Sequence, residues 1–185
     1  MRRTANETRL IIFTACTQIL VRDGLPTLTL AAVAAEAGLS KGGLLYHFPS
    51  KVALVESLFT HHLDEFDNNI QLQLHASEDP SAGRWLRAYA EASVDQIINP
   101  DTASVFASLF AAGERYPSVL QIMRDRYVVW QGKIDQDGLS PEWAVLFRLI
   151  VDGLWFAQLY QFSPPNPALR THIFALLTDL IKQAK

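Results

Sequence analysis

Cysteine is almost missing from this sequence. Cys16 is the only one among 185 residues, which excludes a disulfide framework and a multi-cysteine metal site and suits a reducing compartment. The sequence also lacks the composition of a disordered protein, because 49% of its residues are hydrophobic and no low-complexity repeat is present. The length therefore allows one ordinary folded domain or two small ones.

No stretch is long and apolar enough to predict a membrane span or an export signal. The most apolar segment, 144–162, contains Arg148 and Asp152, which lie four residues apart and can pair on one helix face. Phe13–Cys16 resembles a lipoprotein cleavage site, but the apolar run before the cysteine is too short and charges interrupt the approach. We therefore expect a soluble, cytoplasmic protein.

The sequence patterns of most enzyme classes are missing too. There is no serine elbow, no cysteine–histidine pair with an orienting group, and no glycine-rich phosphate loop after a strand. One segment gathers side chains that bind metals: His61, His62, Asp64, Glu65 and Asp67. A charged, solvated helix face explains it better than a metal site. We expect no metal, no cofactor and no enzymatic activity, with an all-α enzyme as a remote alternative.

Prolines divide most of the chain into helical spans. Because proline is tolerated in the first turn of a helix and stops it elsewhere, each proline-free span predicts a helix. These spans are 50–79, 81–99, 101–116, 118–140, 142–163 and 168–185, with expected N-caps at Ser50, Ser81, Asp101, Ser118 and Ser140. An earlier helix is expected to be capped by Thr4 or Asn6 and ended by Gly24. Since no alternating strand pattern appears, we expect an all-α fold of about nine helices.

Residues 29–47 predict a helix-turn-helix. Thr29 can cap a short alanine-rich helix, 30–37, which Gly38 ends, and Ser40 can cap a second short helix, 41–47. In this motif the first residues of the second helix enter the major groove of DNA. Those residues include two adjacent glycines, which weaken a helix by roughly 2 kcal/mol relative to alanine. Close approach of the backbone to DNA would explain why they are there.

The run Thr29–Lys51, and above all Leu45–Lys51, closely resembles the N-terminal DNA-binding domain of TetR/AcrR-family transcriptional regulators. The resemblance covers about residues 8–60, with a departure at Gly43, where the family often has a larger residue. It implies that the DNA-binding residues are Thr29, Ser40, Lys41, Gly42, Gly43, Leu45, Tyr46, His47 and Lys51. Most would bind phosphates, while Lys41 could reach a guanine edge and Gly42 a thymine methyl.

Each of these residues also has an ordinary structural interpretation. Lys51 could be a solvated lysine, Tyr46 a packed aromatic residue, His47 a core histidine, and Leu45 a core residue. Three apolar neighbours are assigned to the core and not to DNA: Val33, Leu44 and Phe48.

The resemblance implies a division into a DNA-binding domain, 1–50, and a helical domain, 51–185, that binds a ligand and forms the dimer. The predicted helix 142–163 is apolar nearly all round, so both of its sides are expected to be buried. The core of the same chain would cover one side, and a partner subunit could cover the other. Candidate residues of this interface are Trp143, Phe147, Ile150, Gly153, Leu154, Ala157, Ile173, Leu177 and Leu180. The alternative is burial within a monomer.

Aromatic and amide side chains in the middle of the chain are candidates for a ligand pocket. They are Trp85, Tyr89, Phe106, Phe110, Tyr127, Trp130, Gln131, Trp155 and Gln158. An aromatic stripe with helical spacing is also typical of a packed core. We expect a homodimeric repressor that binds double-stranded pseudo-palindromic operator DNA and is released by a small apolar or aromatic effector. A constitutive dimeric DNA-binding protein without a ligand is the main alternative.

The net charge of −3 conceals two halves of opposite sign. Residues 1–51 have a net charge of +3 and the remaining 134 residues have −6. A modestly basic DNA-binding part joined to an acidic part is therefore expected, and two copies would hold DNA better than one.

Overall fold

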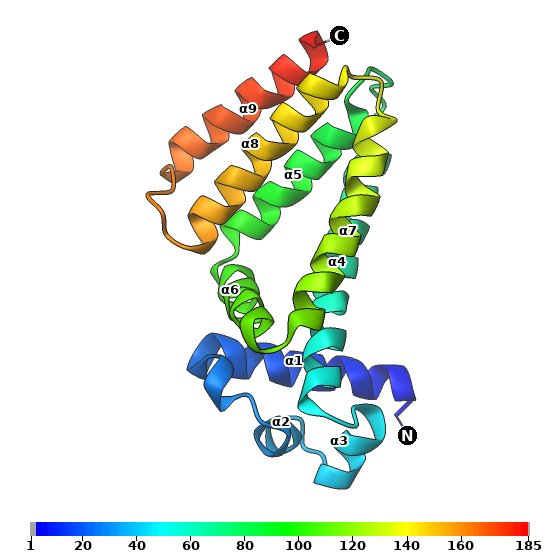
Figure 1. Cartoon of the computed structure of the whole chain (residues 1–185), viewed down its shortest axis with the longest axis vertical. Coiled ribbons are helices and arrows are strands. Elements are labelled where there is room, and N and C mark those ends of the chain that lie inside the picture. The colour runs from blue at the N-terminus through cyan, green and yellow to red at the C-terminus, as the bar shows by residue number, and fades with distance from the viewer. Residues whose placement is uncertain (1–2, 185) are drawn as a thin grey trace. The chain divides into compact units, whose positions relative to one another are not determined.

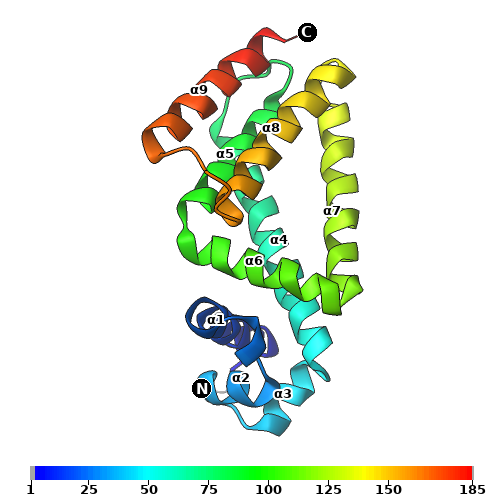
Figure 2. The same ribbon diagram turned by 60° about the vertical axis from the view of Figure 1, so that its left-hand side comes forward.

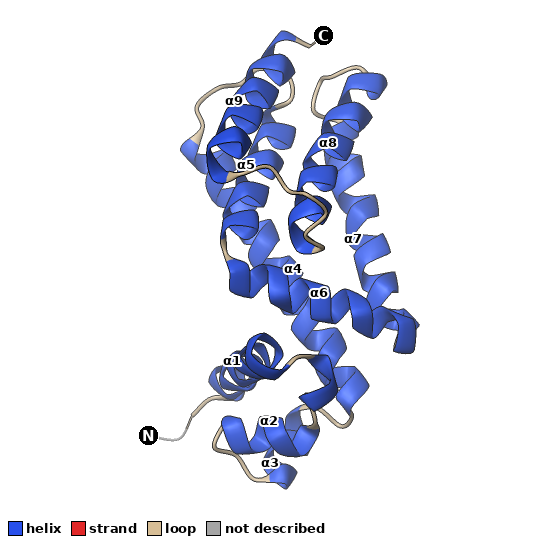
Figure 3. Cartoon of the chain, turned by 90° about the vertical axis from the view of Figure 1, so that its left-hand side faces the viewer, coloured by secondary structure: helices blue, strands red, loops and turns tan. Residues whose placement is uncertain are grey.

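The computed structural model describes residues 3–184, apart from the side chains of residues 95–98 and 100. Over that range the chain is all-α, as predicted, with nine α-helices and one short 3-10 helix (Figures 1 and 3). The α-helices are α1 (Ala5–Asp23), α2 (Leu30–Glu36), α3 (Lys41–His47), α4 (Lys51–Ala76), α5 (Arg84–Ile98), α6 (Pro100–Arg115), α7 (Pro117–Asp135), α8 (Pro141–Leu159) and α9 (Pro167–Gln183). None of these described helices meets the length and hydropathy that crossing a bilayer requires.

The chain forms two compact units. The first consists of Met1–His62 with Ser104–Met123, and the second of Leu63–Ala103 with Arg124–Lys185. Helices α4, α6 and α7 each contribute to both units. The boundary between the two compact units therefore does not fall at residue 50, because the start of α4 and most of α6 belong to the same unit as the N-terminal helices. The functional division at residue 50 stays a prediction.

The first unit is organised by α1. Its N-terminus is a capping box, in which the Thr4 hydroxyl oxygen accepts from the Glu7 N–H at 3.2 Å and the Glu7 carboxylate accepts from the Thr4 N–H at 2.7 Å. Of the two predicted caps, Thr4 is thus the one used. Helix α1 ends at Gly24, whose φ is 75°. Its apolar face packs on α2 and α3, and burial there raises the pKa of the Cys16 thiol to about 12.

The predicted starts of three helices are wrong. Ser50 and Ser140 precede helices as expected, but Ser81, Asp101 and Ser118 are not caps. Helix α5 begins after Gly83, and α6 and α7 begin at prolines. A proline fits the first helical position because its missing N–H would have no partner there. The Asn99 side chain instead accepts from two first-turn N–H groups of α6, at 3.0 and 3.3 Å.

In the second unit α5, α8 and α9 lie side by side (Figures 1 and 2). Helix α8 has two apolar faces, as its sequence predicts. One face is buried and includes Phe147 and Val151, whereas the other is exposed and includes Leu146 and Leu149. The ion pair predicted on this helix is present, with Arg148 Nη1 2.7 Å from Asp152 Oδ2.

Candidate functional site

The predicted helix-turn-helix is present in the first unit. The Thr29 hydroxyl oxygen accepts from the Ala32 N–H at 3.1 Å and caps α2, while the Ser40 hydroxyl oxygen accepts from the Gly43 N–H at 3.0 Å and caps α3. Between the helices Gly38 has a φ of 64°, in the left-handed region that favours glycine. Local side-chain chemistry therefore sets both helix starts and the turn. We call residues 29–51 the reading head.

Helix α3 has one buried side and one exposed side. Leu44 on α3, Phe48 at its end and Val33 on α2 are fully buried, as predicted for core residues. Lys41 and Tyr46 are exposed, and 85% of the Tyr46 side chain is open to solvent. The interpretation of Tyr46 as a packed aromatic residue is therefore wrong.

The remaining candidates of the reading head are exposed or half-buried. Thr29, Ser40 and Gly42 are exposed, whereas Gly43, Leu45 and His47 are half-buried. The His47 ring meets the Tyr46 ring edge-on, with centres 5.3 Å apart. Most of the candidates thus lie on α3 or cap it, whereas Thr29 caps α2 and Lys51 begins α4.

The two adjacent glycines differ in their surroundings. A Cβ atom on Gly43 would lie 3.2 Å from the Ser40 Oγ, so this glycine makes room for the helix cap. A Cβ atom on Gly42 would have no neighbour within 4 Å. Packing within the chain therefore gives no reason for glycine at position 42.

Lys51 begins α4 directly after Ser50, whose hydroxyl oxygen accepts from the Ala53 N–H at 3.1 Å. The Lys51 side chain is half-buried and forms no ion pair with any described residue. Partial burial, and secondly the positive charge of Arg115, lower the pKa of Lys51. This lysine is therefore an unneutralised cation beside α3, a suitable partner for a phosphate.

Four of the nine pocket candidates form an aromatic cluster in the second unit. The Trp85 and Tyr89 rings stack at 5.6 Å between centres, and the Trp130 ring contacts Tyr89 at 5.7 Å and Tyr127 at 5.1 Å. Phe66 of α4 contacts both Tyr89 and Trp130. These rings pack on one another, so the core interpretation accounts for the contacts described.

A buried carboxylate lies against this cluster. The Tyr89 hydroxyl donates to Asp152 at 2.6 Å, and Arg148 bridges Asp152 and the Gln131 side-chain oxygen, at 2.7 and 2.6 Å. Burial raises the pKa of Asp152 and that of Tyr89. The spacing of Arg148 and Asp152 predicts their pairing, but nothing in the sequence indicates that Tyr89 reaches them.

Gln131, bonded to Arg148, is the fifth pocket candidate near the cluster, and the remaining four lie elsewhere. Phe106 and Phe110 belong to the first unit, where each meets the Phe59 ring edge-on. Trp155 and Gln158 lie toward the end of α8, and Gln158 accepts from Arg170 of α9 at 3.4 Å. The nine candidates are therefore divided between the two units.

Two of the acidic side chains considered as metal ligands, Asp64 and Asp67, instead bind an arginine. Arg126 of α7 donates to Asp67 and, at 2.6 Å, to Asp64, and Trp130 donates to Asp67 at 2.7 Å. His61 stacks on Phe13 of α1, with ring centres 4.7 Å apart. Within the described part of the chain, no group of three or more such side chains is arranged to hold a metal ion.

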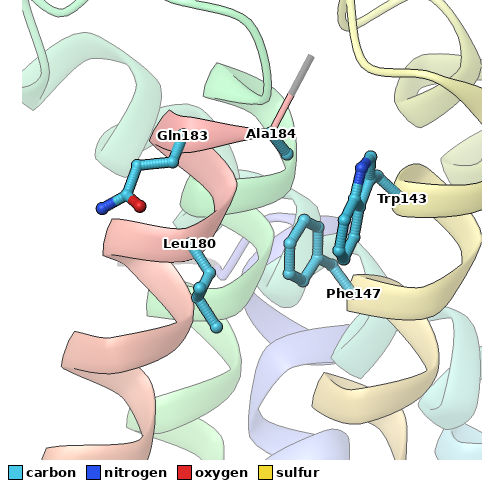
Figure 4. A pocket seen from close by; sticks show the side chains of 5 residues that line it. All are labelled: Trp143, Phe147, Leu180, Gln183 and Ala184. Atoms are coloured by element: carbon cyan, nitrogen blue, oxygen red, sulfur yellow. The ribbon is translucent and has the colours of Figure 1, made fainter.

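One open groove lies between α8 and α9 in the second unit (Figure 4). Its volume is about 410 Å³, and its walls are Trp143, Phe147, Leu180, Gln183 and Ala184. The Trp143 and Phe147 rings stack at 5.3 Å between centres. None of the predicted pocket residues lines this groove, whereas three of the predicted interface residues do.

The exposed faces of α8 and α9 near this groove are strongly apolar. The large hydrophobic residues exposed on the two helices are Trp143, Val145, Leu146, Leu149, Ile150, Phe156, Leu169, Leu176 and Leu180. We call this set the α8–α9 face. Phe147 and Leu177 do not belong to it, because both are buried in the core of the second unit and are only 2% exposed. Of the other interface candidates Gly153 is exposed, and Leu154, Ala157 and Ile173 are half-buried.

Comparison with known proteins covers both parts of the chain. A family model described as "Bacterial regulatory proteins, tetR family" matches residues 12–58, and one described as "Tetracyclin repressor-like, C-terminal domain" matches residues 83–182. The uncharacterized HTH-type transcriptional regulator TtgW of Pseudomonas putida is 26% identical over 98 residues, which are 53% of this chain and 69% of TtgW.

Solved structures share the whole fold. A crystal structure from Pseudomonas aeruginosa PAO1 has a TM-score of 0.79 at 18% identity and covers 98% of this chain and 93% of its own. The multidrug binding protein EbrR complexed with imidazole has a TM-score of 0.67 at 21% identity and covers 94% of both chains. EbrR is also known complexed with malachite green.

Proposed function

Because this chain belongs to the TetR family of bacterial regulatory proteins and is a DNA-binding transcriptional regulator, we propose that it is a homodimeric repressor released from DNA by a small effector. The observation that carries the proposal is the exposed side of α3. Tyr46 is 85% open to solvent although it is a large aromatic residue, and Lys41 is exposed beside it. Contact with DNA would give this exposed helix side a function.

The candidates divide between base and phosphate contacts. Lys41 and Gly42 lie at the start of α3 and would meet base edges, while Thr29, Tyr46, His47 and Lys51 would hold phosphates on either side. Two reading heads would then bind half-sites of a pseudo-palindrome about one helical turn apart or slightly more. Ser40 and Gly43 shape the start of α3, because the Ser40 hydroxyl caps the helix at the Gly43 N–H.

The second copy would pack on the α8–α9 face. Nine large apolar residues are exposed there, which is more than an isolated subunit usually leaves in one place. A four-helix arrangement of α8 and α9 from two subunits would bury them around a twofold axis. The groove beside Trp143 would lie within that interface.

Effector release is supported by the likeness to EbrR, whose structures hold imidazole or malachite green. We propose a small apolar or aromatic effector for this chain too. Helix α4 would transmit the signal, because it starts at Lys51 and continues without a break to Ala76 in the second unit. Binding would change the distance between the two α3 helices, so that one half-site is lost.

Selection of genomic fragments by the purified protein tests the proposal. We expect the bound fragments to share one pseudo-palindrome, and a Lys41→Ala variant to lose its sequence preference. Transcription from a bound promoter should fall when the protein is added and recover with the effector. Imidazole and malachite green are the first compounds to test. Binding to all fragments alike would contradict operator recognition, whereas specific binding that no aromatic compound reverses would favour the constitutive alternative.

The proposed transmission of the signal by α4 has its own test. Spin labels on α3 of both subunits should report a change of separation when the effector is added. If an effector abolishes DNA binding and leaves that distance unchanged, α4 does not transmit the signal in this way.

A further inference from the structure

An arginine outside the predicted DNA-binding set is held by aromatic rings at the end of α3. The guanidinium carbon of Arg9, on α1, lies 4.7 Å from the centre of the Phe48 ring and 5.7 Å from that of Phe13. The two rings contact each other, with centres 5.6 Å apart. Phe48 and Phe13 are buried, whereas Arg9 is partly open to solvent. The charged end of Arg9 is therefore fixed against the core and is not free to swing in solvent.

Arg9 differs from the arginine at the other end of the same helix. Arg22 pairs with Asp23 at 2.8 Å and with Glu36 at 3.0 Å, so its charge is neutralised inside the first unit. Arg9 forms no ion pair with any residue that the structure describes. Its positive charge is therefore available to an anion outside the chain.

The place of Arg9 in the fold suggests which anion. Phe48 is the C-cap of α3 and directly follows His47, while Lys51 begins the next helix three residues later. A cation stacked on Phe48 thus lies next to residues proposed to bind phosphates. The five N–H groups of a guanidinium lie in its plane and suit phosphate oxygens, so stacking on a ring leaves them free to donate.

We propose that Arg9 is a further phosphate-binding residue of the DNA interface, positioned by Phe48 and Phe13. The proposal rests on the DNA contacts proposed for α3 and Lys51. Because the ring contacts already restrict the side chain, less rotamer freedom is lost when the phosphate binds. Arg9 would extend the phosphate contacts from the reading head to α1.

The salt dependence of DNA binding tests the proposal and does not require the operator. The probe is a fluorescein-labelled duplex of mixed sequence, about 30 base pairs long, titrated with the full chain between about 50 and 200 mM salt. We expect Arg9→Gln to flatten the plot of log affinity against log salt by about 0.9 for each bound subunit. Arg22→Gln, which removes the same charge from the same helix, should leave that slope unchanged. Arg9→Lys should retain most of the slope.

A slope for Arg9→Gln equal to that of the unmodified protein would overturn the proposal, whether or not the melting temperature falls, since Arg9 would then be structural only. Arg9→Met, which keeps the aliphatic packing, replaces Arg9→Gln if that variant does not fold. Lys51→Ala distinguishes a failure of the role proposed for Arg9 from a failure of the proposed DNA interface. If Lys51→Ala flattens the slope and the Arg9 variants do not, only the role of Arg9 is wrong. If neither does, the proposed DNA interface is wrong as well.

Discussion

At the scale of single residues, Gly38 and Gly42 occupy different environments within four positions of each other. Gly38 has a φ of 64°, so a side chain there would strain the backbone of the turn. Gly42 has no such φ, and a Cβ atom there would meet nothing within 4 Å. Glycine at 38 is therefore required by the fold, whereas glycine at 42 weakens its helix without an intramolecular reason.

Gly42→Ala should separate stability from DNA binding. We expect the free energy of unfolding to rise by about 0.5–1 kcal/mol, because alanine favours the helix, and the affinity for operator DNA to fall, because a methyl group would meet the bases. Urea denaturation and fluorescence anisotropy measure the two quantities. Gly38→Ala is the control and should destabilise the protein by about 1 kcal/mol. Unchanged DNA affinity in Gly42→Ala would remove this residue from the interface.

Asp152 should make stability depend on pH in an uncommon direction. Burial raises the pKa of this carboxyl, so the native state binds the proton more readily than the unfolded chain does. The contribution of Asp152 is then greatest below its unfolded pKa, roughly 3.9, and decreases as pH rises through the folded pKa. We expect the stability difference between the unmodified protein and Asp152→Asn to shrink as pH rises above about 4.

Urea denaturation at several pH values measures this difference. Glu142→Gln serves as the control of opposite sign, because hydrogen bonds of its own backbone N–H and of Ser140 lower the pKa of Glu142 at the start of α8. A difference for Asp152→Asn that grows with pH would mean that the Arg148 ion pair outweighs burial.

At the scale of helices, the start of α5 depends on a residue far along the chain. The Asp137 carboxylate accepts from the Trp85 N–H at 2.9 Å and the Leu86 N–H at 2.8 Å, two first-turn donors that no nearby side chain satisfies. Its backbone carbonyl accepts from the Gly83 N–H at 2.7 Å. The segment between α7 and α8 thus caps α5.

Asp137→Ala should therefore destabilise the protein by about 1–3 kcal/mol, since it leaves two partly buried N–H groups unpaired. Urea denaturation measures the loss, and hydrogen exchange should quicken first in the opening turn of α5. The control is Asp135→Ala, which removes an exposed carboxylate and should change stability by less than about 0.5 kcal/mol. Equal effects of the two substitutions would contradict the capping role.

The contrast between Thr29 and Asp137 explains what the sequence can predict. The helix-turn-helix can be predicted from the sequence because the residues that define it, Thr29, Gly38 and Ser40, act on backbone groups within three residues of themselves. Asp137 acts on residues about 50 positions away, and the predicted cap of α5 at Ser81 was accordingly wrong. The buried contact of Tyr89 with Asp152 depends on tertiary packing in the same way. Pocket residues therefore cannot be chosen from aromatic spacing alone.

At the scale of the whole molecule, charge and apolar surface are coupled. Residues 1–51 have a net charge of only +3, and the rest of the chain has −6. Arg2, which contributes one of these positive charges, lies outside the described residues. The affinity of one such N-terminal part for a polyanion is limited, because each phosphate contact adds a modest increment. Joining two N-terminal parts raises the effective concentration of the second once the first has bound. The α8–α9 face would thereby contribute to DNA affinity without touching DNA.

Leu149→Asp tests this coupling. Leu149 is 54% exposed on α8, within the α8–α9 face, so the substitution should leave the fold of a subunit intact. In a twofold interface it would bury two carboxylates, and we expect the dimer to weaken by about 4 kcal/mol, roughly a thousandfold. Sedimentation velocity should then detect monomers, and operator affinity should fall although no residue of the reading head has changed.

The matched control for this test is Val128→Asp. Val128 is 72% exposed on α7, so it presents an equally apolar surface outside the α8–α9 face. We expect Val128→Asp to keep the mass and the DNA affinity of the unmodified protein, while Leu176→Asp, on α9, should repeat the effect of Leu149→Asp. Dimers that persist in both Leu149→Asp and Leu176→Asp would place the interface elsewhere. Monomers that bind the operator as tightly as the unmodified protein would show that affinity does not depend on joining two reading heads.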